Sequence, residues 1–287
     1  MKTKKKKKHN IPFIISTIIF ISAFVALLIY LYHMHLEKKG LDNIKSLRNN
    51  AQASFTTDKE DEEEQTLDYY LIDNKVVQVE FKDLYLANQD TVGWLKIDDT
   101  PVDYPVMYIP EDEEYYIHKD FDKNYSASGS IFIGSGADIT RPSENMILYG
   151  HHMINNTMFK PLDKYADEDY YKEHKYITFD TLRQTGTYEI IAAFRTKIYY
   201  SKEEGFMYYT YTDLRNKEDF DEYIANCNKI KLYDTDATAE YGDQLITLST
   251  CAYHTYNGRF VVVAKRIDGL EVDTEKDPIE VISTKEE

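Results

Sequence analysis

The feature that most limits the fold is a run of 22 residues, Ile11–Tyr32, that contains no charged side chain. As an α-helix, such a run spans about 30 Å, which matches the hydrocarbon core of a bilayer. Tyr30, Tyr32 and His33 lie at its end, where aromatic side chains gather at a membrane–water interface. The sequence therefore predicts a transmembrane anchor over residues 11–33. No second apolar run of this length follows, so we expect the chain to cross the membrane once.

Charge on the two sides of this run predicts its orientation. Lys2 and Lys4–Lys8 precede it, which favours a cytoplasmic basic tail over residues 1–10 and a C-terminal part outside the cell. The chain would then be a single-pass type II protein of the cell membrane. A cleaved signal peptide is the alternative, but the run is longer than a signal h-region and no convincing A-x-A site follows it.

The part of the chain outside the anchor is strongly acidic. The net charge is −16, yet residues 1–39 hold eight lysines and one acid. The remainder therefore has 26 basic residues (34 less 8) and 49 acidic ones (50 less 1), a net charge of −23. Such a domain is a poor partner for nucleic acid or an anionic membrane surface. Solubility is the ordinary explanation of this charge, and an amine-bearing partner is the more specific one.

Composition divides the same part of the chain into three. Residues 34–67 form a polar stalk with the acidic run Thr57–Gln65, residues 68–270 form the folded domain, and residues 271–287 form an acidic tail. Two segments within the domain predict helices, residues 156–165 and residues 219–229.

Short β-forming runs separated by Asp, Asn, Gly and Pro clusters predict a mostly β domain. This many short strands indicate a β-barrel or a sandwich. The predicted strands are Val92–Ile97, Val102–Val106, Ser130–Ile133, Asn145–Tyr149, Tyr176–Thr181, Tyr188–Thr196, Asp243–Thr250 and Arg259–Arg266.

One cysteine stands at the end of a predicted strand. The run Gln244–Cys251 is followed by a turn containing Asn257-Gly258 and then by a second β run that begins at Arg259, which predicts a hairpin. The thiol and the guanidinium can approach each other closely in such a hairpin. Nearby positive charge favours the thiolate nucleophile, and a guanidinium can stabilise the oxyanion of a tetrahedral intermediate.

The simpler interpretations of these residues are structural. Cys251 could be a buried core thiol or could be bridged to the second cysteine, Cys227, and Arg259 could be a surface cation. Cys227 lies on the apolar stripe of the predicted helix over residues 219–229, so we expect a buried thiol there. The pairing of Cys251 with Arg259 across a hairpin favours the nucleophile.

Acyl transfer also needs an acid or base to protonate the leaving amine, and histidine is the usual residue. His151 and His152 follow a predicted strand that ends in a Gly turn, and His254 follows Cys251 closely in the sequence. The residues alone leave these three histidines in contention. The acidic pair Glu203-Glu204 is more typical of solvated surface than of a metal site, and we expect no metal and no cofactor.

At this point the motifs resemble a known family. Thr247-Leu-Ser-Thr-Cys251, followed by Asn257-Gly-Arg259-Phe-Val-Val-Val-Ala-Lys265, is similar to the active-site signature of the sortases, and its TLSTC form resembles class B. Tyr149-Gly-His-His-Met153 resembles the class B segment Y-G-H-x-M. Three further stretches agree in order: Gly93-Trp-Leu-Lys-Ile, Tyr104-Pro-Val and Ser128-Gly-Ser-Ile-Phe132. The resemblance covers roughly residues 70–268.

The resemblance implies an eight-stranded β-barrel with added helices and a Cys-His-Arg site. Cys251 would be the nucleophile, His151 the general acid/base, and Arg259 the oxyanion and substrate clamp. Ser249 matches a position that lines the substrate groove, and Tyr209 lies in the segment that matches the class B substrate loop. The stretch from Asp112 to Ile117 matches a run that grips the sorting peptide, so Glu113 and Ile117 are further substrate-binding candidates.

One departure affects specificity, because Glu113 stands where the family usually has Asn. The implied reaction cleaves a sorting-signal peptide after Thr through a thioacyl enzyme and passes the acyl group to a cell-wall amine. The expected partners are a surface protein or pilin that bears the signal and a peptidoglycan precursor or other amine acceptor, and we expect a monomer.

Three other functions stay open at this point. They are a pilin-polymerising sortase with a Lys acceptor, a cysteine peptidase that hands the acyl group to water, and a membrane-tethered barrel that binds without catalysis. A papain-type enzyme is disfavoured, because the C-G-S-C-W signature is missing and His precedes Cys in the chain.

Overall fold

A computed structural model describes residues 11–53, 66–134, 136–137, 144–200, 203–252 and 255–284. The predicted basic tail and the acidic run Thr57–Gln65 lie outside these residues. The chain divides into two compact units, Met1–Leu47 and Arg48–Glu287. The helix α1 (Ile11–Ala53) continues beyond residue 33, where the predicted anchor ends. Among the described residues, its stretch Pro12–Asn49 is the one helix long and apolar enough to cross a membrane.

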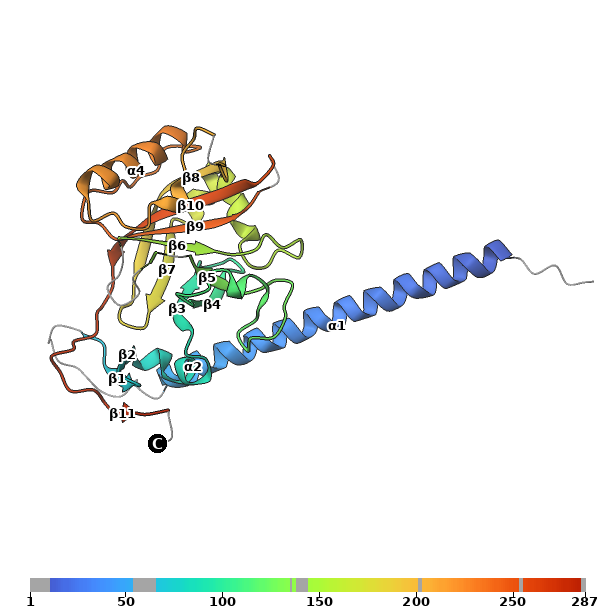
Figure 1. Ribbon diagram of the computed structural model, residues 1–287, viewed down its shortest axis with the longest axis horizontal. Coiled ribbons are helices and arrows are strands. Elements are labelled where there is room, and N and C mark those ends of the chain that lie inside the picture. Colours follow the sequence, from blue (N-terminus) through green and yellow to red (C-terminus); the bar gives the residue numbers. More distant parts are fainter. Residues whose placement is uncertain are drawn as a thin grey trace, which may run out of the picture. The chain divides into compact units, whose positions relative to one another are not determined.

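The second unit is built around a closed β-barrel, so the mostly β prediction is confirmed and the barrel is chosen over the sandwich (Figure 1). The strands follow one another around the barrel in the order β10-β8-β7-β3-β4-β5-β6-β9. All eight predicted strands are present, with ends within two residues of those predicted. They are β3 (Thr91–Lys96), β4 (Asp103–Met107), β5 (Ile131–Ile133), β6 (Asn145–Tyr149), β7 (Tyr176–Thr181), β8 (Thr187–Lys197), β9 (Leu245–Cys251) and β10 (Gly258–Asp268).

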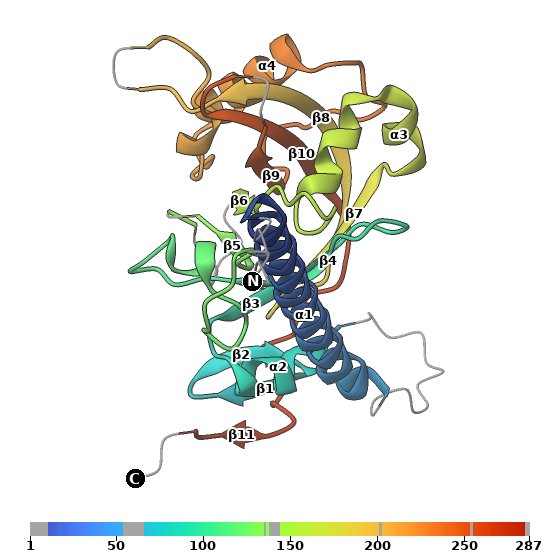
Figure 2. The ribbon, with the colours of Figure 1, turned by 90° about the vertical axis from the view of Figure 1, so that its right-hand side faces the viewer.

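A separate three-stranded sheet lies beyond one end of the barrel, next to the short helix α2 (Lys82–Ala87), as Figures 1 and 2 show. It contains β1 (Tyr69–Ile72), β2 (Lys75–Gln78) and β11 (Val281–Ile282). β1 and β2 form a hairpin, and β11 pairs with β1 in parallel, with Leu71 opposite Val281. Part of the predicted C-terminal tail is therefore a strand of this sheet.

The helices differ in how closely they follow the sequence pattern. α4 (Lys217–Ile230) matches the predicted helix over residues 219–229, whereas residues 156–165 form no α-helix and only the 3-10 helix η3 (Lys160–Ala166) appears there. Asn156 and Met158 have positive φ angles of 62° and 55°, which a right-handed helix excludes. The remaining elements are η1 (Val79–Phe81), η2 (Tyr115–His118), α3 (Glu168–Glu173) and η4 (Tyr208–Thr210).

The space between α4 and the barrel is filled with aromatic side chains. Phe194 of β8 packs there with Tyr208 of η4 and with Phe220, Tyr223 and Cys227 of α4, and all five are buried. The Cys227 thiol is free, and so is the Cys251 thiol, which excludes the disulfide considered above. The tyrosine hydroxyls in this cluster need polar partners because they are buried, and two of the partners come from β9.

Candidate active site

The alternation of side chains along β9 decides which way Cys251 faces. Thr247 and Ser249 share one face of the strand, and their hydroxyls contact Tyr223 and Tyr208 at 2.6 Å each. Cys251 is the next residue in the same alternation, so its thiol emerges on the face that η4 and α4 cover. It ends the strand and is half-buried, so the thiol combines a fixed backbone with access from outside.

Arg259 lies directly across from the cysteine. β9 and β10 are antiparallel, and the Cα atoms of Cys251 and Arg259 are partners in the register. Partners of this kind have side chains on the same face, with Cβ atoms about 5 Å apart. One guanidinium nitrogen donates to the backbone oxygens of Asn257 and Gly258, at 3.4 and 3.0 Å. Within the described residues, the other two guanidinium nitrogens have no hydrogen-bond partner and remain available for a ligand.

His151 reaches the same region from β6, which runs parallel to β9 with Tyr149 opposite Ser249. Extending that register by two residues brings His151 beside Cys251. The His151 Nε2 atom lies 2.7 Å from the carbonyl oxygen of Ile117. A carbonyl can only accept, so Nε2 carries a proton and Nδ1 is the nitrogen that can exchange one. The imidazole also stacks on His118, with ring centroids 5.3 Å apart.

The other histidine candidates have different surroundings. The His152 Nε2 atom lies 2.5 Å from Asp163, which also accepts a hydrogen bond from Lys160 at 2.8 Å. Burial raises the pKa of Asp163, but these two partners outweigh it and hold that pKa below its usual range. The His152 ring is thus engaged by the Lys160–Asp163 ion pair of η3. His254 lies outside the described residues.

The electrostatics place two tyrosines close to the thiol and the guanidinium. Burial raises the pKa of Tyr208 to about 12; its hydrogen bond to Ser249 and the charge of Arg259 lower it, while the charge of Cys251 raises it. Burial also raises the pKa of Tyr149, with Tyr208 and Glu113 adding to the increase and Arg259 opposing it. Both hydroxyls therefore stay neutral at physiological pH and can donate hydrogen bonds.

The predicted substrate-binding residues fall into two groups. Glu113 is exposed just before η2, and Ile117 of η2 offers its carbonyl to His151. Ser249 is only 1% exposed because Tyr208 covers it, and Tyr209 uses its hydroxyl to bridge the backbone of Tyr199. Glu113 and Ile117 are thus at least partly open to solvent, whereas Ser249 is buried.

Sequence reasoning missed three residues at this site: Tyr149, Tyr208 and His118. Tyr149 stands two residues before His151, so the alternation of β6 could have placed it on the same face. Tyr208 and His118 reach the site through long-range packing, for which the sequence carries no local signal. No group of three His, Cys, Asp or Glu residues that could hold a metal ion occurs among the described residues.

One glycine fixes the carbonyl that holds His151, and this gives a testable prediction. Gly129 has a φ of 57°, and a Cβ atom there would lie 2.3 Å from the Ile117 oxygen. We expect Gly129→Ala to cost about 1–3 kcal/mol of folding free energy and to lower kcat, because the displaced carbonyl no longer holds the imidazole. Gly242→Ala is the matched control: its φ is 105°, but nothing lies within 4 Å. Denaturant unfolding and turnover of both variants test this, and equal losses of turnover would contradict it.

A thiol, a guanidinium and an imidazole meet at the ends of three neighbouring barrel strands, and this arrangement is typical of a thiol acyl-transfer enzyme. The comparisons with known proteins name its family. The model of the sortase domain matches residues 95–267, and the chain belongs to the sortase family. Membership implies a cysteine transpeptidase of the cell wall.

The individual relatives narrow the group to class B. The chain is 33% identical to sortase B of Staphylococcus aureus over 193 residues, which cover 67% of this chain and 76% of that protein. It is 31% identical to sortase B of Listeria monocytogenes over 196 residues, which cover 68% and 76%. The structure of a Staphylococcus aureus sortase B–substrate complex superposes with a TM-score of 0.64 at 29% identity, covering 80% of this chain and 97% of that one. The predicted class B resemblance is confirmed.

Proposed function

We propose that the Cys251 thiolate attacks the carbonyl carbon of a Thr residue in a sorting-signal peptide, so that the peptide is cleaved after this Thr. The S–C bond forms, Arg259 stabilises the oxyanion, and the C–N bond breaks as protonated His151 gives its proton to the leaving amine. An acceptor amine then attacks the thioester, loses its proton to His151, and releases the thiolate. The observation that carries this proposal is the register pairing of Cys251 with Arg259 on one face of the barrel.

We propose that the acceptor is an amine of a cell-wall peptide and that the enzyme acts as a monomer outside the cell. The apolar stretch of α1 supports an anchored enzyme, with residues 11–33 in the membrane, residues 1–10 in the cytoplasm and the catalytic domain outside. The domain boundaries at residues 68 and 270 and the acidic tail 271–287 belong to the same proposal. Glu113 and Ile117 border the sorting peptide, and Ser249 and Tyr209 support the groove beneath it.

The test incubates the full chain in detergent micelles with a library of sorting-type peptides and with amine acceptors. Mass spectrometry is expected to show a thioacyl adduct on Cys251 and an amide product. If every amine gives only the hydrolysed peptide and no amide product, the protein is a cysteine peptidase and not a transpeptidase. If no peptide forms an adduct and a methanethiosulfonate does not modify Cys251, the protein is a membrane-tethered binding module without catalysis.

A further inference from the structure

Two aromatic rings pack one after the other beside the imidazole of His151. The ring of His118 lies 5.3 Å from the His151 ring, centroid to centroid, with 18° between the planes. The ring of Tyr125 lies 6.1 Å from the His118 ring, at 34°. Both separations fall in the range of attractive ring pairs, about 4.5–7 Å. Among the described residues the His118 ring forms no hydrogen bond and no ion pair, so it interacts with His151 through its ring face.

This ring contact constrains a rotation that the hydrogen bond of His151 leaves open. The terminal torsion of a histidine side chain is broad, so the imidazole can turn about its Cβ–Cγ bond. The Nε2 atom lies close to that axis, so its 2.7 Å hydrogen bond to the Ile117 oxygen resists the turn only weakly. A ring stacked on the face of the imidazole opposes the turn directly. His118, the residue after Ile117, is therefore placed to fix the direction of the His151 Nδ1 atom.

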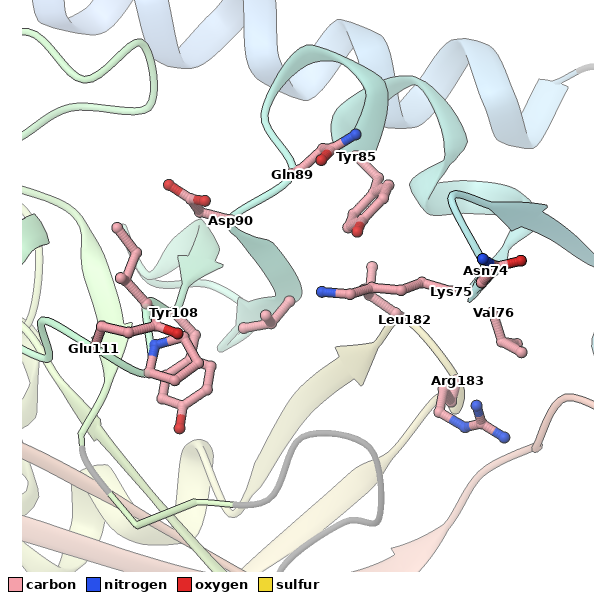
Figure 3. A pocket seen from close by; sticks show the side chains of 13 residues that line it. Asn74, Lys75, Val76, Tyr85, Gln89, Asp90, Tyr108, Glu111, Leu182 and Arg183 are labelled. Carbon is pink, nitrogen blue, oxygen red and sulfur yellow. The ribbon is translucent and has the colours of Figure 1, made fainter. Parts of the chain in front are cut away.

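The helix η2, which carries both Ile117 and His118, is tied to the interior of the domain by Tyr116. The Tyr116 side chain is 1% exposed, and its hydroxyl donates to Asp90 at 2.8 Å and accepts from Asn88 at 2.9 Å. Asp90 lies on the loop between α2 and β3, where Figure 3 labels it. These bonds hold η2 in place, so the carbonyl and the ring that contact His151 have a fixed base.

The segment that carries Tyr125 is attached to the same part of the domain. Lys123 forms an ion pair with Asp90 at 2.8 Å, so one carboxylate holds both this segment and η2. The backbone N–H of Ser126 donates to the carbonyl oxygen of His118 at 3.1 Å, which keeps Tyr125 beside His118. The rings of His118 and Tyr125 are exposed, but the backbone beneath them is hydrogen-bonded to the rest of the domain.

We propose that His118 is a positioning residue, which holds the plane of the His151 imidazole so that Nδ1 is directed at the reacting groups on Cys251. This inference rests on the proposed function, because it assigns His118 a part in the proton transfers of His151. The imidazole gives a proton to the leaving amine in the first step and takes one from the acceptor amine in the second. Loss of the stacked ring therefore slows both steps and leaves binding of the peptide unchanged.

The kinetic test compares His118→Ala and His118→Phe with the unaltered full chain in detergent micelles, using a sorting-type peptide and an amine acceptor. We expect His118→Ala to lower both the rate of thioacyl formation and the kcat of aminolysis about tenfold, with the KM for the peptide within about twofold. His118→Phe keeps a flat ring against the imidazole and is expected to recover both rates to within about threefold. An equal loss in the two variants, or a raised KM with an unchanged kcat, would overturn the proposal.

His174→Ala is the matched control. His174 also packs against an aromatic ring, that of Tyr170 at 4.2 Å between centroids, but it lies at the end of α3 and belongs to no part of the proposed site. This variant is expected to keep both rates. If it lost as much as His118→Ala, the losses would come from the general removal of a ring contact, and the assignment of His118 would be wrong.

A second measurement needs no turnover, so it separates failure of this inference from failure of the proposed function. It is NMR spectroscopy of the same chains with isotope-labelled histidine, in which the His151 Nε2–H signal is identified by its loss in His151→Gln. His118→Ala is expected to speed exchange of this proton with water at least about fivefold, because the ring leaves the Ile117 carbonyl more often, and His118→Phe to keep the original rate. Equal exchange rates in all three chains would overturn the proposal. If no peptide is turned over while the expected rates are found, the proposed function fails and the constraint on the His151 ring stands.

Discussion

Cys251→Ala is expected to abolish both thioacyl formation and amide product, a loss of at least about 10⁴-fold in kcat. The loss is this large because the proposed thioacyl intermediate forms on this thiol. The measurement is turnover of a sorting-type peptide, with mass spectrometry of the intact chain to detect the adduct.

Cys227→Ala is the matched control, because the two cysteines differ in environment and not in chemistry. Cys227 is 2% exposed beneath α4, and burial raises the pKa of its thiol well above the ordinary value, so it stays protonated and out of reach. We expect Cys227→Ala to retain turnover and to lose about 1 kcal/mol of folding free energy. An adduct on Cys227, or product from Cys251→Ala, would show that the nucleophile is misassigned.

The barrel strands were predictable because each is a short β-forming run between turn residues. The hairpin of Cys251 and Arg259 was predictable for the same reason, since Asn257-Gly258 fixes where the chain reverses. The predicted helix over residues 156–165 was wrong because Asn156 and Met158 adopt positive φ angles, which depend on tertiary contacts. For example, the Met158 backbone N–H donates a hydrogen bond to the hydroxyl of Tyr104. Periodicity carries no information about such contacts.

The surroundings of the site were less predictable than its chemistry. Tyr208 lies against Ser249 because α4 and the segment before it fold over β9, and 41 residues separate the two in the chain. The strand β11 was likewise hidden, because its two residues gain their pairing from β1.

The largest expected effect on stability comes from Arg48. This arginine belongs to the same compact unit as the barrel, and its guanidinium lies 2.5 Å from Asp180 and 3.3 Å from Glu80. It also stacks over Trp94, 5.2 Å from the ring centroid. The Asp180 side chain is 6% exposed, so removing Arg48 leaves a buried carboxylate without its cation. Arg48→Ala is expected to cost about 3–5 kcal/mol of folding free energy.

The stability penalty of Arg48→Ala is expected to depend on pH, and the pKa of Asp180 decides in which direction. Burial raises the pKa of Asp180 more than Arg48 and the Gly186 N–H lower it, so the ionised carboxyl is the costly form in the folded state. Loss of Arg48 raises that pKa further. Because the charge disappears on protonation, the penalty of Arg48→Ala is largest near pH 7 and shrinks as the pH falls through the raised pKa.

The measurement is denaturant unfolding of the full chain in detergent micelles, followed by tryptophan fluorescence. Trp94 is the single tryptophan, and its ring lies beneath the Arg48 guanidinium, so its fluorescence reports on this part of the structure. Lys96→Ala is the control, because its pair with Asp98 is exposed on both sides and contributes at most about 1 kcal/mol. Adding Asp180→Asn to Arg48→Ala is expected to restore most of the loss, since it removes the buried charge. A penalty for Arg48→Ala that matched the control, or that did not vary between pH 5 and pH 7.5, would mean that Asp180 is solvated and that Arg48 is not its essential partner.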